Sequence, residues 1–140
     1  MSGRYFVDTN VFVYALDQSV PAKSQIARRI IGRLLDENAG VISPQVMHEF
    51  FAVALRKFKD VLTVQDARAF LETAFAGMEI QPSSIRVADT ALRLLERYGF
   101  HWYDSLILAA ALEAQCDILY SEDFQHKQRI EGVEIINPFA

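Results

Sequence analysis

Two acidic side chains follow apolar runs of the sequence at positions that suit chemistry. Asp8 comes directly after the run 5–7, and Asp123 lies two residues after the run 117–121. If both runs are buried parallel strands, the two carboxylates lie at the edge where sheets of this kind bind ligands. Each acid also has a structural interpretation, because Asp8 together with Asn10 could cap the next helix, and Asp123 could begin a turn.

Two further acids, Asp104 and Glu49, lie on predicted helices. Asp104 falls in the first turn of a helix that is apolar on almost every side, on the same stripe as Leu108. A helix N-terminus favours a carboxylate, but a buried charge also needs a cation or hydrogen-bond donors nearby. Glu49 lies at the edge of an apolar helical face, where exposure to solvent or pairing with Arg56 is the alternative to a functional role.

Together, the four acids predict a pocket that binds cations. Like charges that share a pocket repel one another, so such a cluster persists only if it binds positive ions. Oxygen ligands without cysteine or clustered histidine select Mg²⁺ or Mn²⁺ rather than Zn²⁺. Two such ions roughly 4 Å apart can activate a water molecule and stabilise the leaving oxygen of a phosphoryl displacement. An acidic protein could therefore hydrolyse a polyanion.

These acids require a scaffold in which short strands alternate with helices. The sequence predicts buried strands at 5–7, 41–43, 79–81, 117–121 and 133–136. Helices are predicted over 11–16, from 19–21 to about 38, from 44 to about 58, over 63–77, from 83–84 to 99, and over 103–115. This alternation predicts an α/β fold with a parallel sheet covered by helices on both faces. We expect one domain over residues 1–140.

Composition narrows the class of protein. The chain has 140 residues, of which 51% are hydrophobic and 23% charged, as is typical of a globular domain. The formal net charge of −4 argues against a protein that holds nucleic acid by bulk positive charge. Cys116, the single cysteine, is expected to pack as a small hydrophobic residue. The sequence has no apolar stretch suited to a signal peptide or a membrane span, so we expect a cytoplasmic protein.

The segments that carry the acids resemble, in order, those of the PIN-domain ribonucleases, and most of all the VapC-type toxins of toxin–antitoxin pairs. They are Phe6–Ala15, Ser43–Phe50, Trp102–Ala111 and Leu119–Phe124, with the closing Ile135–Phe139 also similar. A motif such as Asp8-Thr9-Asn10 occurs by chance in many proteins. The occurrence of all these segments in this order, in a chain of this length, is a specific indication of the family.

The resemblance implies a compact, PIN-like α/β/α sandwich around a short parallel sheet. It implies a Mg²⁺- or Mn²⁺-dependent endoribonuclease that cleaves single-stranded RNA through a metal-activated water. A cognate antitoxin that blocks the active site, and a homodimer, are further implications.

The same resemblance assigns roles to individual residues. It implies that Asp8 and Asp104 are the principal metal ligands, and that Glu49 and Asp123 complete the acidic, catalytic pocket. Two more positions, Asn10 and Ser121, match those that support such a site by hydrogen bonding. Lys127 stands where relatives often have glycine, which bears only on the conformation of its loop.

Other polar and aromatic residues have two interpretations each. Trp102 and Tyr103 could stack on a nucleobase, although an aromatic pair before a buried helix more often packs against the core. Small basic clusters could contact an RNA backbone or simply be solvated; they contain Arg28, Arg29, Arg33, Arg56, Lys57 and Lys59. The three histidines are scattered, and a histidine base is unnecessary where metal ions lower the pKa of water.

Alternative functions fit the sequence less well. A haloacid-dehalogenase-like phosphatase would use Asp8 as its nucleophile, but it needs an Asp where this chain has Asn10, and a nearby Lys. A response-regulator-like receiver needs an Asp after the third strand, where this chain has Gln81-Pro82-Ser83. A catalytically silent, PIN-like nucleic-acid-binding module is a further alternative, against which the complete set of four acids argues.

Overall fold

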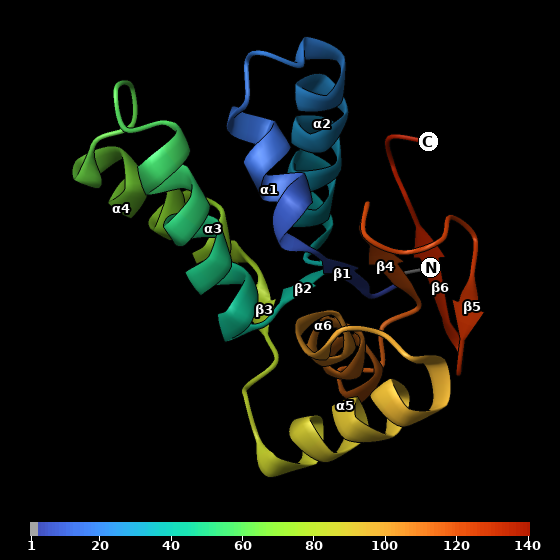
Figure 1. Cartoon of the computed structure of the whole chain (residues 1–140). Coiled ribbons are helices and arrows are strands. Elements are labelled where there is room, and N and C mark those ends of the chain that lie inside the picture. Colours follow the sequence, from blue (N-terminus) through green and yellow to red (C-terminus); the bar gives the residue numbers. More distant parts are fainter. Residues whose placement is uncertain (1–2) are drawn as a thin grey trace.

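Strands and helices alternate along the chain in the computed structural model, which describes residues 3–140 (Figure 1). The strands are β1 (Tyr5–Val7), β2 (Gly40–Ile42), β3 (Glu79–Ile80), β4 (Ile118–Tyr120), β5 (Arg129–Ile130) and β6 (Val133–Ile136). The helices are α1 (Thr9–Leu16), α2 (Pro21–Glu37), α3 (Pro44–Lys57), α4 (Val64–Thr73), the 3₁₀ helix η1 (Phe75–Gly77), α5 (Ile85–Tyr98) and α6 (Trp102–Glu113).

The six strands form one sheet in the order β3-β2-β1-β4-β6-β5. The first five strands of this order run parallel, and β5 pairs antiparallel with β6. From β1 the chain continues to β2 on one side and only later to β4 on the other, so strand order reverses beside β1. The carboxyl ends of β1, β2 and β4 therefore border the crevice in which a fold of this kind binds ligands.

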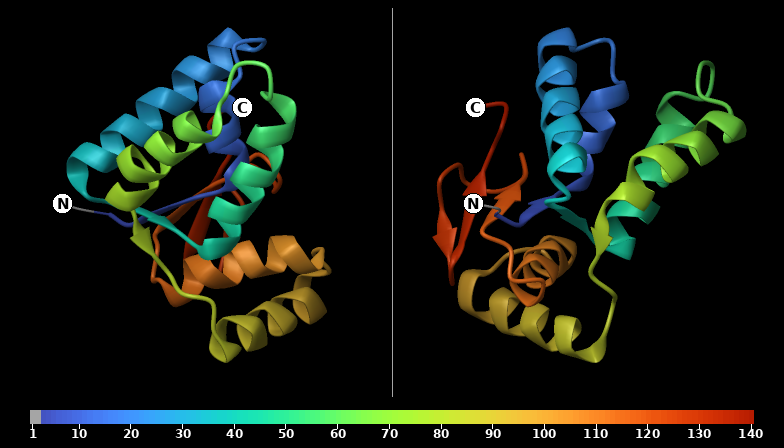
Figure 2. Two further views of the ribbon diagram at one scale, coloured as in Figure 1. Left: turned by 90° about the vertical axis from the view of Figure 1, so that its left-hand side faces the viewer. Right: turned by 180° about the vertical axis from the view of Figure 1, so that it is seen from behind.

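Helices cover both faces of the sheet, as the sequence predicts. Helices α1 and α2 pack together on one face, and α5 and α6 pack together on the other (Figures 1 and 2). Helices α3 and α4 lie beside the end of the sheet that β2 and β3 form, where α3 also contacts α1. The α/β fold with a mostly parallel sheet is thereby confirmed.

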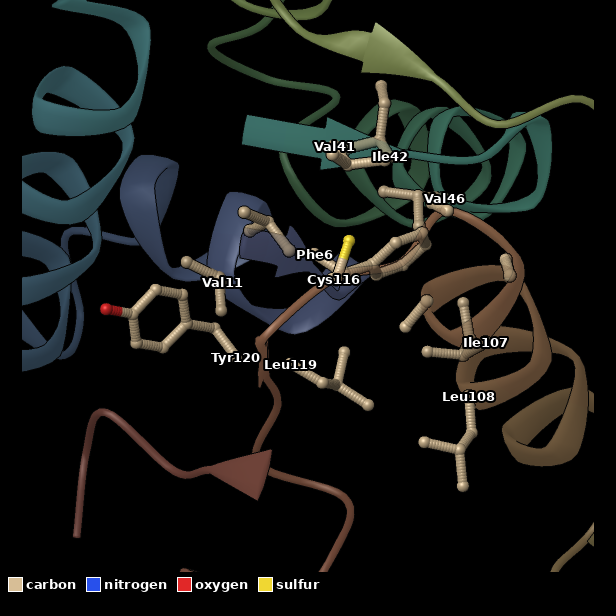
Figure 3. Packing of buried hydrophobic residues seen from close by; sticks show 14 of the residues in the cluster. Phe6, Val11, Val41, Ile42, Val46, Ile107, Leu108, Cys116, Leu119 and Tyr120 are labelled. Carbon is tan, nitrogen blue, oxygen red and sulfur yellow. The ribbon is translucent and has the colours of Figure 1, made fainter. Parts of the chain in front are cut away.

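Both faces of the central strands are buried, which explains their unbroken apolar sequence. Phe6 and Val7 of β1 and Leu119 of β4 have no exposed surface. Figure 3 shows Phe6 and Leu119 among side chains from both helical layers, including Val11 from α1 and Ile107 from α6. The sheet is thus held by apolar packing from two sides.

Local signals in the sequence fix most helix ends. Pro21 and Pro44 stand in the first turn of α2 and α3, where a missing backbone N–H costs least. Thr63 and Asp66 form a capping box at the start of α4. Gly99 ends α5 in the left-handed conformation, with φ of 74°.

One predicted helix is too long, and one strand is missing from the prediction. The helix predicted over 63–77 ends at Thr73 and continues as the separate turn η1. Strand β5 is absent from the prediction because two residues are too few to give an alternating pattern. It forms because the residues between β5 and β6, Glu131 and Gly132, both have positive φ, 50° and 96°. A two-residue turn of this kind has the twist that a hairpin requires.

The thiol of Cys116 is 4% exposed and packs in the core, as predicted. Burial raises its pKa to about 12, so it stays protonated at neutral pH. Among the helices formed by residues 3–140, none combines the length and apolar character that crossing a bilayer requires.

A cluster of aromatic rings joins α3 and α4 to α1. Phe50 of α3 stacks on Phe70 of α4 with ring centroids 4.6 Å apart, and it meets Phe75 of η1 edge-on at 5.3 Å. Phe12 of α1 approaches Phe75 at 4.8 Å. Because Phe50 is fully buried among these rings, we expect it to hold α3 in place beside the sheet.

The Phe50→Ala variant is expected to lower the free energy of unfolding by about 3–5 kcal/mol, since it leaves a cavity among the rings. Urea denaturation followed by circular dichroism measures the loss. Phe51→Ala is the matched control, because the next residue of α3 is only partly buried and should cost less. Equal losses in the two variants would contradict the central position of Phe50.

The Lys127→Gly variant is expected to raise the free energy of unfolding by up to about 1 kcal/mol. Lys127 has φ of 66°, in the left-handed region where a Cβ atom crowds the backbone, and its N–H is held by the carbonyl of Ile135. Lys127→Ala keeps the Cβ atom and should give no such gain. The two variants are compared by the same denaturation experiment, and equal stabilities would contradict the argument.

Candidate active site

The candidate site lies where β1 and β4 end side by side. The backbone N–H of Asp8, the first residue after β1, donates to the carbonyl of Tyr120, the last residue of β4. Asp8 is also the N-cap of α1 and is 4% exposed. Its carboxylate is thereby fixed at the carboxyl end of the sheet, as the sequence predicts.

Both oxygens of the Asp8 carboxylate accept hydrogen bonds. Oδ1 accepts from the backbone N–H of Thr9 at 2.7 Å, and Oδ2 accepts from the hydroxyl of Ser121 at 2.7 Å. The Ser121 oxygen accepts in turn from the N–H of Asp123 at 3.1 Å. Asp8 therefore caps α1 with one oxygen and contacts the loop after β4 with the other, so the capping interpretation of this residue is confirmed.

Asn10 joins α1 to the same loop. Its amide Nδ2 donates to Oδ2 of Asp123 at 3.1 Å, and its Oδ1 accepts from the N–H of Glu122 at 3.3 Å. Asn10 and Ser121 thus hold the 121–123 loop against the start of α1. These are the contacts expected of residues that support a site.

Glu49 and Asp104 approach from the other side of the crevice. Glu49 is exposed on α3, and its Oε1 accepts from Nε2 of Gln45 at 2.6 Å. The same Gln45 amide donates to the carbonyl of Tyr103 at 3.1 Å, beside Asp104. Glu49 therefore pairs with Gln45 and not with Arg56, the partner suggested by the sequence. A side chain one turn away on the same helix face reaches Glu49 more easily than one two turns away.

Neighbouring carboxylates contribute to a raised pKa at Asp8 and at Asp104. Burial raises the pKa of Asp8 to about 7, the Ser121 and Thr9 donors oppose the rise, and the charges of Asp123 and Glu49 add to it. Burial also raises the pKa of half-buried Asp104, again with a contribution from Asp123. Asp123 therefore affects both of the buried acids.

The four acids do not, however, form a closed cage. Within residues 3–140, no three Asp, Glu, His or Cys side chains lie close enough together to hold a metal ion. The exposed acids are turned toward local amide donors, Asp123 toward Asn10 and Glu49 toward Gln45. The oxygen donors suit Mg²⁺ or Mn²⁺ in kind, and exposed side chains held by single amides can turn toward an ion.

Two side chains that the sequence does not indicate hold Glu122. Its carboxylate accepts from Nζ of Lys23 at 2.7 Å and from the hydroxyl of Tyr14 at 2.8 Å. The Lys23 ammonium also lies over the rings of Tyr14 and Phe139. Separations of 99 and 108 positions leave no local pattern that could reveal these pairs.

Several of the basic side chains hold the fold together. Arg28 donates to the carbonyl of Ala15 at 2.7 Å, and Arg33 donates to the hydroxyl of Tyr120 at 2.8 Å. Lys57 pairs with Asp17 at 2.8 Å. These contacts join α2 and α3 to neighbouring elements, so the side chains of these three residues are not simply solvated.

A small cleft of about 280 Å³ lies beside the acids, between α1, α3 and the 121–123 loop. Its walls include Asn10, Glu49, Lys57 and Asp123. Acidic groups and one ammonium group therefore face the same space.

The chain belongs to the PIN-domain family, whose model matches residues 5–130. This finding agrees with the resemblance seen in the sequence. Membership of this family replaces the two alternatives of a haloacid-dehalogenase-like phosphatase and a response-regulator-like receiver. No curated protein matches the chain at a significant level.

Solved structures share the fold at low sequence identity. A toxin–antitoxin complex from Klebsiella pneumoniae superposes with a TM-score of 0.68 at 20% identity, covering 96% of this chain and 97% of that one. VapC20 of Mycobacterium tuberculosis, a toxin that cleaves the sarcin–ricin loop, gives 0.64 at 16% identity, covering 85% and 89%. A DNA-bound VapBC from Salmonella typhimurium gives 0.65 at 18% identity, covering 96% and 97%.

The Asp8→Asn variant is expected to be more stable than the parent in EDTA at pH 8, by on the order of 3 kcal/mol. The folded-state pKa of about 7 lies above the ordinary aspartate value of 3.8, so between these two pH values Asp8 is protonated in the folded chain and ionised in the unfolded chain. The parent therefore loses stability as the pH rises through this window, and the variant does not. Chemical denaturation at a series of pH values measures the difference, which should shrink toward zero near pH 4.

Ser121→Ala is the matched comparison, since it removes a hydrogen bond that favours the ionised form of Asp8. It should destabilise the protein more at pH 8 than at pH 5. A pH-independent difference between the parent and Asp8→Asn would contradict the raised pKa.

Proposed function

We propose that the chain is a Mg²⁺- or Mn²⁺-dependent endoribonuclease that cleaves single-stranded RNA. The observation that carries this proposal is the buried Asp8 carboxylate at the reversal of strand order, linked through Ser121 to the loop that bears Asp123. A buried carboxylate with other acids nearby is costly, and the PIN-domain match favours a nuclease as its use.

We assign Asp8 and Asp104 as the principal metal ligands, with Glu49 and Asp123 completing the set. A bound divalent ion would supply an activated water molecule and stabilise charge on the leaving oxygen. The Thr9 amide and the Ser121 hydroxyl hold Asp8 in one orientation. Glu49 and Asp123 would exchange their amide partners for the ion, which their exposed positions allow.

We further assign the chain the role of the toxin in a toxin–antitoxin pair. The support is that structures of similar fold include a toxin–antitoxin complex, a DNA-bound VapBC and a VapC toxin that cleaves the sarcin–ricin loop. An antitoxin protein that covers the acids, a homodimeric state and a cytoplasmic location are parts of the same proposal. A catalytically silent nucleic-acid-binding module is the competing outcome.

Replacing Asp8 or Asp104 with asparagine is expected to reduce Mg²⁺-dependent cleavage of single-stranded RNA by more than about a hundredfold, because each loses a charged ligand. The measurement is cleavage of an end-labelled RNA, with the fold checked by circular dichroism. Asp89→Asn, at an exposed position of α5, is the control and should cleave like the parent. Undiminished cleavage by both site variants would overturn the assignment, and no cleavage by the parent with Mg²⁺ or Mn²⁺ would favour the silent module.

A further inference from the structure

A groove of about 660 Å³ lies along α3. Helices α3, α5 and α6 and the segment between β3 and α5 form its walls. We call it the α3–α5 groove. The residues that line it include Ser43, Gln45, Glu49, Ala52, Ala88 and Tyr103.

The α3–α5 groove is continuous with the candidate active site. Glu49 lines both this groove and the cleft that contains Asn10 and Asp123. Tyr103, on its rim, directly precedes Asp104, and Gln45 bridges the Tyr103 carbonyl to Glu49. A chain-like ligand with a phosphate at the acids can therefore place its next unit in the groove.

The walls suit a flat aromatic ligand. They are predominantly apolar, and the small side chains of Ala52 and Ala88 keep the space between α3 and α5 open. Tyr103 is 65% exposed, although large aromatic rings usually pack against the rest of the protein. Its neighbour Trp102 is partly buried against the core. The structure thus separates the two roles that the sequence left open for this pair.

The groove wall also contains polar groups. Ser43 is 6% exposed, and its hydroxyl is closed to solvent and has no hydrogen-bond partner among residues 3–140, so it does not face a ligand directly. The amide nitrogen of Gln45 donates to Glu49 and to the Tyr103 carbonyl, which leaves its amide oxygen to accept from a ligand. A mostly apolar groove with a few polar groups is typical of a small-molecule subsite.

We propose that the α3–α5 groove binds the nucleobase next to the scissile phosphate of single-stranded RNA, with the Tyr103 ring stacked on that base. This inference rests on the proposed nuclease function and adds a substrate subsite to it. Unpaired bases are recognised by stacking on aromatic side chains and by hydrogen bonds to their edges. Tyr103 provides the first kind of contact, and the amide oxygen of Gln45, in the groove wall, is placed for the second. A short strand held in this way needs no basic surface, which suits a chain with a net charge of −4.

The test measures the coupling between Tyr103 and single bases of the RNA. Binding of a short labelled single-stranded RNA is followed by fluorescence anisotropy in the Asp8→Asn background, which removes cleavage. In a series of RNAs, one nucleotide at a time is made abasic. One position should weaken binding roughly tenfold to a hundredfold when its base is removed, as expected for one stacked base.

Tyr103→Ala should weaken binding of the intact RNA by a similar factor and make that position insensitive to loss of its base. Tyr103→Phe keeps a ring and should retain the coupling. Ala52→Phe, at an exposed position of α3, should weaken binding by filling the groove without changing an acid.

Additive effects of Tyr103→Ala and of every abasic position would overturn the base subsite. So would a change from dimer to monomer in Tyr103→Ala, measured by light scattering, with unchanged RNA affinity, because the groove would then be a protein interface. If the parent cleaves RNA but shows no coupling, only the subsite fails. If the parent neither binds nor cleaves single-stranded RNA, the proposed function fails and the subsite fails with it.

Discussion

The buried carboxylate of Asp8 is the constraint on which the rest of the site depends. It terminates the central strand, caps α1 through the Thr9 amide and accepts from the Ser121 hydroxyl, so three elements meet at one side chain. Its burial raises its pKa to about 7 and makes ionisation unfavourable for the folded state. Such a group is tolerated because the surrounding packing stabilises the fold, and it is useful because a cation would restore its charged form.

That packing is supplied by apolar layers on both faces of the sheet. Phe6 of β1 is fully buried between them, and the Phe50 ring cluster ties α3 to α1. Rigid elements of this kind hold the acids at fixed places, as precise chemistry requires. The side chains of the site that can still turn are those of the exposed acids Glu49 and Asp123, which accept hydrogen bonds from neutral amides.

Hydrogen-bonding side chains divide the crevice into two compartments. Asn10 and Ser121 order the loop on the α1 side, and Gln45 joins α3 to the start of α6 on the other. Glu49 stands between the small polar cleft and the larger apolar groove. This arrangement supports a division in which one compartment acts on a phosphate and the other accepts a base.

The sequence by itself determined most of the elements, most of their ends and the placement of acids after strands, because these follow from local apolar patterns and caps. It indicated Asp8 and Asp123 by their places after strands, and Asn10 and Ser121 by their match to the PIN-domain pattern. Only the tertiary structure decided that Lys23 and Tyr14 hold Glu122, that Gln45 rather than Arg56 pairs with Glu49, and that Tyr103 is exposed while Trp102 is partly buried. The physical reason is that such contacts depend on how separate elements pack, and neither periodicity nor spacing along the chain records that geometry.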